Sequence, residues 1–487
     1  MLISSAASAE FFHTSAGTAF IDLLIDSHRE TWPVRSKRFR TWLRRRHYEI
    51  TRTVATAAAI NSALDLFEAQ AQFDGPEQAV HVRIAEHGGN IYLDLADECW
   101  RAVEIGPSRW CVVGSPPVRF RRAPGMLPLP TPQPGGSVEE FASFLNLSSR
   151  NDFVLVVAWL LATLRAGGPY PVLAISGEQG SAKTVLSKLL KDLIDPNVAT
   201  VRALAREERD LVIAANNSHV LAFDNLSGLP HALSDAFCRL ATGASFGLRQ
   251  LYTDADEVLF QATRPILLNG IEDVIGRSDL ADRALFLTLP PIADRHRRSE
   301  SQLWGDFEVA RPRILGALLG AVAHGLRNLP SIHLEQLPRM ADFALWATAC
   351  ETAFWPTGTF ARAYQANRGA AIEDLVDADP IAARVRAIMA NRRTWTGTAS
   401  ELLRAGIDSA GDSPSSASAA WPKTPRALAG RLRRAQTFLR TLGIEMSFSR
   451  HGRAGTRTIR ISSACKNSRP PVSDGGTVSP VSPVSRD

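Results

Sequence analysis

A short stretch near the middle of the chain brings together residue types that bind phosphate groups. Its sequence is ISGEQGSAKT, residues 175–184, and it lies between an apolar run and a predicted helix that contains VLSKLLKDLI. A glycine-rich turn between a strand and a helix points successive backbone N–H groups at one place, where a polyphosphate can bind. Lys183 is placed to reach the β and γ phosphates, and the Thr184 hydroxyl to ligate Mg²⁺. The sequence therefore predicts an ATP and Mg²⁺ site made of Gly177, Glu178, Gln179, Gly180, Ser181, Ala182, Lys183 and Thr184.

One position departs from the usual pattern G-x-x-x-x-G-K-T. Ala182 stands where the last glycine is expected, while Gly180 still provides the turn. A methyl group is tolerated at that position if the residue already has helical geometry. The interpretation of the loop therefore assumes helical geometry at Ala182.

A carboxylate follows the next predicted buried strand. The segment HVLAFDNL ends its apolar run at Asp224, on the side of a parallel sheet where ligands bind. We predict Asp224 as the metal carboxylate, together with Thr184. The next residue is Asn225, which can orient a water molecule but cannot accept its proton. Hydrolysis is then slow, or another acid such as Glu272 or Asp273 assists.

Two further segments carry polar groups that fit the same chemistry. RPILLNG places Asn269 at the end of a third strand, where its amide could touch the γ phosphate and the attacking water. RSDLADRALFLTL places Arg277 and Arg283 around a helical turn, and if subunits form a ring one of them can reach a neighbour's nucleotide. The alternative to a catalytic role is, for each arginine, a surface salt bridge with Asp279 or Asp282. The predicted catalytic residues are Lys183, Asp224, Asn225, Asn269 and Arg283.

Apolar runs alternate with helical patterns from the phosphate-binding stretch to about residue 291, which predicts a covered parallel sheet in an α/β fold. Prolines and glycines crowd the segment SPPVRFRRAPGMLPLPTPQPGG, which we interpret as a linker. The predicted organisation is an α+β N-terminal domain (1–115), a linker (116–136), the α/β core (137–299), a helical subdomain (300–376), a winged-helix domain (380–462) and a disordered tail (463–487).

Positive charge is concentrated in two places, although the net charge of the 487 residues is only +6. The second cluster, residues 421–462, combines the helix TPRALAGRLRRAQTFLRTLGI with a glycine-rich basic turn, and its arginines predict DNA binding. The first cluster, RSKRFRTWLRRRH, leaves two alternatives open. FRTWLRRRHYE is either a helix buried on the side of Phe39, Trp42 and Leu43 with its arginines in water, or a nucleic-acid contact. Asp22 and Asp26 lack the further carboxylates and histidine of a polymerase site, so we expect no primase activity in the N-terminal domain.

The order GEQGSAKT, AFDN, ILLN and RSDLADR resembles the AAA+ P-loop ATPase core, and within it the superfamily three helicases and the poxvirus-type primase-helicases of phages and mobile elements. The whole chain also looks like uncharacterised bacterial ATP-binding proteins associated with primase-helicase modules. The resemblance implies a ring, of six subunits by analogy with the family, and a DNA-contacting hairpin within residues 239–265. The positions that match this hairpin in kind are Thr242, Gly243, Arg249 and Tyr252.

These features together predict an ATP-hydrolysing motor that works on single-stranded or forked DNA, with a primase as a possible partner. Two alternatives remain: a DNA-binding ATPase switch that does not unwind DNA, and an adaptor that binds ATP without hydrolysing it. The apolar stretches FVLVVAWLLATL and ILGALLGAVA are too short to span a bilayer, and no basic region precedes an apolar core at the N-terminus. We therefore expect a cytoplasmic protein with no membrane partner.

Overall fold

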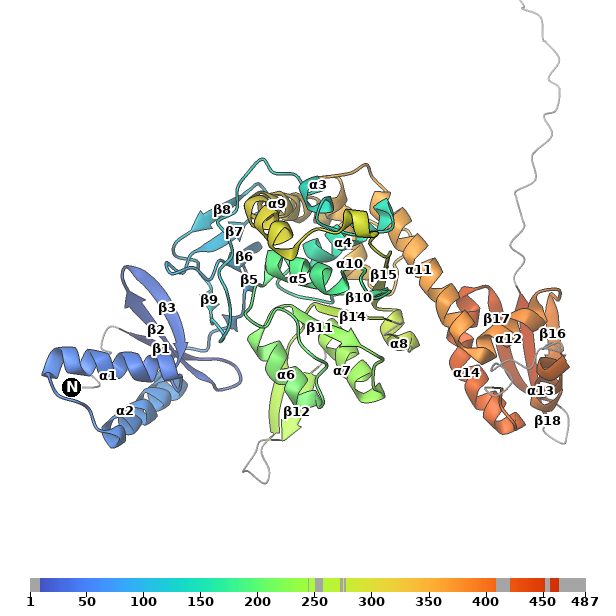
Figure 1. The fold of residues 1–487 in the computed structure, drawn as a ribbon. Helices are drawn as coiled ribbons and strands as arrows, with labels where there is room; N and C mark the ends of the chain where they lie inside the picture. Colours follow the sequence, from blue (N-terminus) through green and yellow to red (C-terminus); the bar gives the residue numbers. More distant parts are fainter. Residues whose placement is uncertain are drawn as a thin grey trace, which may run out of the picture. The chain divides into compact units, whose positions relative to one another are not determined.

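The computed structural model describes residues 9–243, 245–249, 257–271, 275, 277–408, 421–451 and 456–463. The chain divides after Arg368 into two compact units, and helix α11 (Thr359–Ala378) spans the division. The architecture is mixed α/β and contains a parallel sheet, which confirms the predicted class (Figure 1). Apart from its first residue, the segment predicted as a disordered tail lies outside the described residues.

The first unit opens with a three-stranded antiparallel sheet and two helices that share one core. Ser36 caps α1, its hydroxyl accepting a hydrogen bond from the backbone N–H of Phe39. Phe39 and Leu43 of α1 pack with Leu64 and Phe67 of α2, and all four are buried. The elements are β1 (Glu10–His13), β2 (Ala19–Ile25), β3 (His28–Pro33), α1 (Lys37–Thr51), α2 (Ala57–Ala69) and a π-helical turn (Gln70–Asp74).

A second antiparallel sheet follows, with the strand order β5-β6-β7-β8. Gly88 and Gly89 have positive φ values of 59° and 80° and make the turn between β5 and β6. Strand β4 precedes this sheet in the sequence and β9 follows it, and these two short strands form a parallel pair. The strands are β4 (Val80–His81), β5 (Ile84–His87), β6 (Asn90–Asp94), β7 (Ala102–Ile105), β8 (Trp110–Val113) and β9 (Arg119–Phe120).

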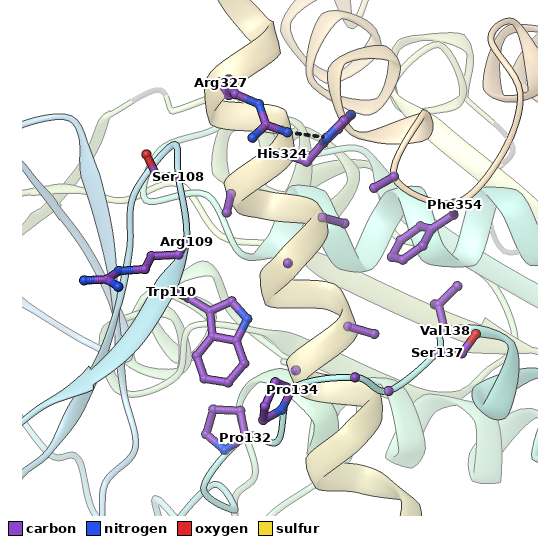
Figure 2. Close-up of a pocket in the computed structure, with 18 of the residues that line it drawn as sticks. Ser108, Arg109, Trp110, Pro132, Pro134, Ser137, Val138, His324, Arg327 and Phe354 are labelled. Carbon is purple, nitrogen blue, oxygen red and sulfur yellow. Dashed lines mark hydrogen bonds between the residues drawn. The ribbon is translucent and has the colours of Figure 1, made fainter.

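The proline- and glycine-rich segment 116–136 is a strap packed along the unit. Phe120 and Leu129 are buried, and the backbone N–H of Leu129 donates to Leu95 O at 2.9 Å. Further on, the segment crosses helix α9 (Glu300–Asn328), where a Cβ on Gly316 would lie 1.8 Å from Gln133 O. Figure 2 shows Pro132 and Pro134 of the strap against this helix, beside a cavity of about 910 Å³. The close passage of the strap therefore explains the glycine at position 316 of α9.

The centre of the first unit is a four-stranded parallel sheet with the order β11-β14-β10-β15. Side chains alternate between its faces. Val172 and Ala174 of β10 pack with α6 and α7, whereas Leu173 and Ile175 pack with α4 and α5. Both faces are thus covered, which explains why the strands are almost continuously apolar (Figure 1). The strands are β10 (Val172–Gly177), β11 (Leu221–Leu226), β14 (Ile266–Gly270) and β15 (Ala284–Leu289).

Helices surround this sheet, and the most apolar of them, α4, is buried from Phe153 to Thr163. No helix within the described ranges is long and apolar enough to cross a membrane. A β-hairpin, β12 (Ser245–Arg249) with β13 (Glu257–Gln261), lies between β11 and β14 in the sequence. The remaining helices of the unit are α3 (Glu139–Ala142), α4 (Arg150–Thr163), α5 (Lys183–Ile194), α6 (Glu208–Asn217), α7 (His231–Thr242), α8 (Ser278–Ala281), α9, α10 (Ala341–Glu351) and α11, with 3-10 turns at Asp294–His296 and Leu329–Ser331.

The second unit has its own core, built from three helices and an antiparallel sheet with the order β16-β18-β17. Val385 of α12, Leu402 of α13 and Leu432 of α14 meet Ile461 of β18 in this core. The elements are α12 (Pro380–Met389), β16 (Thr394–Gly397), α13 (Ala399–Asp408), α14 (Pro425–Thr441), β17 (Ile444–His451) and β18 (Thr456–Ser463).

A buried ionic network joins the second antiparallel sheet to the central one. Arg83, fully buried, pairs with Asp195 at 3.1 Å and also donates to the carbonyls of Asp94 and Leu127. Lys191 reaches the other oxygen of Asp195 at 3.0 Å. Burial acts to raise the pKa of Asp195, but the two cations hold it well below its ordinary value.

Candidate functional site

The loop between β10 and α5 has the backbone that the sequence pattern predicts, except at its last residue. Gly177 and Gly180 have φ values of 145° and 84°, and a Cβ on Gly177 would lie 2.6 Å from Leu289 O, so this position needs glycine. The prediction assumed helical geometry at Ala182, but the structure contradicts this. Ala182 is the N-cap of α5 with φ 66° and ψ 29°, in the left-handed region. The chain makes its final turn into the helix at this residue, and its methyl group makes that turn strained.

Lys183 is the first residue of α5, and its ammonium group lies over the loop. Its Nζ donates to Gly177 O at 2.7 Å and to Glu178 O at 2.8 Å. Burial lowers the pKa of Lys183, and the carboxylate of Asp224 opposes that shift. The first N–H groups of a helix have no partner within it, so positive charge and backbone donors face the same place. The arrangement can bind an anion.

Thr184 and Asp224 meet across the carboxyl edge of the sheet. The Thr184 hydroxyl donates to Asp224 Oδ1 at 3.1 Å, and the backbone N–H of Asn225 donates to the same oxygen at 2.7 Å. The other carboxylate oxygen and the hydroxyl lone pairs are the oxygen ligands that Mg²⁺ prefers. Among the described residues, no group of three or more histidine, cysteine, aspartate or glutamate side chains could hold a metal by itself.

Asn225 and Asn269 complete the cluster at the strand ends. Asn225 is exposed and has φ 58°, and its backbone N–H also donates to Asn269 Oδ1 at 3.1 Å. Asn269 is only 1% exposed, and its Nδ2 donates to the hydroxyl of Ser187 at 2.8 Å. Both ends of the Asn269 amide therefore make protein contacts, and they link the end of β11 to helix α5.

The structure brings together Lys183, Thr184, Asp224, Asn225 and Asn269 because the strand order places β14 between β10 and β11. All three strands are parallel, so their carboxyl ends share one edge. Glu178 and Gln179 are exposed in the loop, and Ser181 is buried with its hydroxyl donating to Glu178 O.

Arg283 lies at the amino ends of the parallel strands, opposite to the edge where the loop lies. It precedes β15, and its carbonyl accepts a hydrogen bond from the N–H of Val172, the first residue of β10. The loop follows the last residue of β10, so roughly 20 Å of strand separates the two. The Arg283 guanidinium donates to Asp279 O. Arg283 therefore cannot reach the loop of its own chain.

A surface salt bridge, the alternative considered for each arginine, is observed for Arg277. Its guanidinium pairs with Asp235 at 2.8 Å and lies 3.9 Å from the carboxylate of Asp279. The other aspartate considered, Asp282, pairs with Arg368 at 3.5 Å.

Sequence reasoning missed two residues beside the loop. The amide of Asn146 donates to Ser181 O at 3.1 Å and to Pro290 O at 2.6 Å, and so joins the loop to the end of β15. A Cβ on Gly180 would lie 3.8 Å from a guanidinium nitrogen of Arg297, a largely exposed side chain paired with Asp294. Neither residue lies in a recognised motif; the basic run RHRR, which contains Arg297, was the available signal.

Several predicted residues fall partly or wholly outside the described part of the chain. Glu272, Asp273 and Tyr252 lie outside the described residues, and only the backbone of Arg249 is described, in β12. Thr242 ends α7, and Gly243 caps it with φ 91°.

The second unit presents a basic groove between α14 and the β17–β18 hairpin, with a volume of about 900 Å³. The groove is lined on its charged side by Arg426, Arg433, Arg450 and Arg457. The guanidinium of Arg433 lies 5.0 Å from the ring centre of Phe448. Leu428, Leu432 and Leu439 of α14 are buried, whereas Leu442 is only half-buried. Residues 452–455 of the hairpin lie outside the described residues.

Fold and site together define a mixed α/β protein with a glycine-rich strand–loop–helix site at the edge of a parallel sheet and a separate basic unit. Residues 138–378 match the model of the actinomycete integrative conjugative element replication protein family, and residues 381–473 match the model of that family's C-terminal domain. Over these residues the chain belongs to this replication protein family. Residues before 138 lie outside both matches.

Comparison with curated proteins gives no match. Among solved structures, the apo C-terminal region of NrS-1 has 10% identity and a TM-score of 0.42, covering 96% of this chain and 99% of that chain. A JCV helicase bound to a small molecule has 15% identity and a TM-score of 0.23, covering 48% of this chain and 72% of that chain. Neither similarity is close enough to support a functional argument.

Proposed function

We propose that this protein binds ATP and Mg²⁺ at residues 177–184 and hydrolyses ATP to drive a helicase step in replication of a mobile element. The single observation that carries the proposal is the placement of Lys183 inside the glycine loop with Thr184 3.1 Å from Asp224. An anion-binding loop and a metal-binding pair lie side by side, which is the combination that phosphoryl transfer needs. The strand order, with Asn269 between the loop strand and the aspartate strand, further supports an AAA+ P-loop core.

Each residue of the cluster has a distinct task in this proposal. The loop N–H groups and the α5 N-terminus bind the phosphates, and Lys183 exchanges its two carbonyl partners for phosphate oxygens. Thr184 and Asp224 hold Mg²⁺, which when bound neutralises charge that develops on the phosphates. Asn269 holds in place the end of β11 that carries Asp224 and Asn225.

Asn225 is consistent with alternatives to a fast ATP-driven motor. Its exposed amide can orient water but cannot accept a proton, so a DNA-bound ATPase switch, or an adaptor that binds ATP without turnover, fits this residue better than a fast motor does. Arg283 lies too far from its own loop to contribute, so we assign it to a neighbouring subunit's nucleotide in a ring, which the resemblance suggests is hexameric.

DNA contact is assigned to two places. The groove of α14 and β17–β18 has the helix and hairpin of a winged-helix domain, with arginines suited to phosphates. The β12–β13 hairpin matches the position of the DNA-contacting hairpin that the resemblance implies. A primase is the further partner that we consider, because no polymerase site is expected in this chain.

The test measures ATP binding by titration and ATP turnover with and without single-stranded DNA. Lys183→Ala is expected to lower ATP affinity at least ten-fold, whereas Lys188→Ala, one turn further along α5, serves as the matched control and binds normally. Arg283→Ala is expected to keep binding and lose turnover. Stimulation by DNA supports the motor, a DNA-independent rate supports the switch, and absence of turnover supports the adaptor. Absence of any ATP binding by the unmodified protein would remove all three.

A further inference from the structure

A groove beside helix α1 gathers aromatic and cationic side chains that the proposed function does not use. Its volume is about 1140 Å³. One wall is a single face of α1, since its lining residues follow helical spacing: Lys37, Arg38, Thr41, Trp42 and Arg45. The opposite wall comes from residues 96–98 and 121–126, and Trp32 and Trp100 also line the groove.

The aromatic rings of the groove are held rigidly. Trp42 is half-buried, stacks on Phe39 with ring centres 5.9 Å apart, and meets Trp32 edge-on at 6.4 Å. The guanidinium of Arg38 lies 4.8 Å from the ring centre of Trp32 and pairs with Glu30. Part of Trp42 thus remains accessible in a fixed orientation, with a flat cationic group nearby, and nucleic-acid bases stack on both kinds of surface.

The charge of the groove is positive. Five cations line it against two carboxylates, and the charged lining residues are Lys37, Arg38, Arg45, Arg121, Arg122, Asp97 and Glu98. Lys37 is exposed and makes no ion pair within the described residues, and Arg45 pairs only with the exposed Glu49. Exposed pairs of this kind are weak. Lys37 and Arg45, two turns apart on one helix face, are therefore available to phosphates.

We propose that this groove binds a single strand of nucleic acid, with phosphates at Lys37 and Arg45 and a base stacked on Trp42. A single strand fits better than a duplex because only unstacked bases expose a face to a tryptophan ring. Apart from Asn217, the residues that line the groove precede both family matches, and none belongs to the loop at residues 177–184. The proposal does not depend on ATP binding.

The test measures binding of a fluorescent oligothymidine strand to the full chain by anisotropy, with excess unlabelled duplex present to occupy the basic groove of the second unit. Lys37→Glu combined with Arg45→Glu is expected to weaken binding at least ten-fold. Loss of two phosphate contacts is also expected to reduce the slope of log affinity against log salt by about 1.4. The matched control is Arg44→Glu with Arg46→Glu on the same helix. It makes the same number of charge reversals, and Arg46 also pairs with Glu49, yet neither residue lines the groove.

The control pair is expected to change affinity less than three-fold. Trp42→Ala is expected to weaken binding roughly ten-fold and Trp42→Phe to restore most of it, since a ring is what the base requires. Circular dichroism and ATP titration check that the variants fold and that the loop site is intact. An equal loss in the control pair would show a general charge effect and overturn the proposal. So would an equal loss of duplex affinity, measured without competitor.

Discussion

Replacing Ala182 with glycine tests whether the loop is as strained as its backbone indicates. Ala182 has φ 66° and ψ 29°, a conformation in which the Cβ of an L-residue is crowded by the following carbonyl oxygen. That crowding costs about 1–2 kcal/mol for a residue other than glycine. Ala182→Gly removes it without deleting a buried apolar side chain.

The gain is partly offset in the unfolded state. Glycine gives the unfolded chain more freedom, which costs roughly 0.4–1 kcal/mol relative to alanine. The expected net result is an increase of about 0.5–1 kcal/mol in the free energy of unfolding. Urea unfolding followed by circular dichroism, with the slope compared between variants, measures this difference.

Ala366→Gly is the matched control for the same chemical change. Ala366 is exposed in the interior of α11 and has ordinary helical surroundings. Its replacement is expected to cost about 0.8–1 kcal/mol. The two substitutions should therefore have opposite signs. If Ala182→Gly destabilises the protein as Ala366→Gly does, the assignment of strain to the loop is refuted.

Two other variants probe buried charge. Burial raises the pKa of Asp192 to about 6, with Arg311 opposing the shift, so its carboxyl favours the folded state below pH 4 and this contribution is lost as pH rises to 6. At pH 8, Asp192→Asn is therefore expected to unfold at a higher urea midpoint than the unmodified protein, with a free energy of unfolding larger by up to about 3 kcal/mol. Near pH 4 the two proteins are expected to have the same stability. Arg83→Met leaves Asp195 without one of its two cations and is expected to cost about 3–5 kcal/mol of unfolding free energy. Arg45→Met, which removes an exposed pair, is expected to cost less than about 1 kcal/mol, and similar losses in both would contradict the importance of burial.

Local sequence patterns predicted the parts of the fold that depend on local geometry. The parallel strands of the core follow from residue type and spacing, because apolar runs alternate with helical patterns there. The packing of the strap at residues 116–136 could not be predicted, because its prolines indicate an irregular path but do not show whether that path packs against the unit. The contact of Arg83 with Asp195 joins positions 112 residues apart, and no periodicity marks such a pair.

The candidate site was predictable to the extent that strand ends converge. Lys183, Thr184 and Asp224 were grouped by the rule that parallel strands end at one edge. The structure places Thr184 in contact with Asp224, and Lys183 beside Thr184 at the start of α5. Asn146 and Arg297 come from segments with no motif and reach the loop only through tertiary packing. The conformation of Ala182 was mistaken because a helix boundary cannot be located to one residue from sequence.

The irregular backbone of β11 between Phe223 and Leu226 explains why asparagine suits position 225 in this chain. Its φ of 58° lies where asparagine and aspartate are tolerated and longer side chains are strained. Its backbone N–H bridges the side chains of Asp224 and Asn269, so this part of β11 cannot relax without disturbing Asp224, the proposed metal carboxylate. A glutamate at this position would supply the missing base only at a cost of roughly 1–2 kcal/mol in backbone strain. The backbone that fixes Asp224 against Thr184 therefore disfavours a proton acceptor at position 225, which agrees with the slow turnover that we propose.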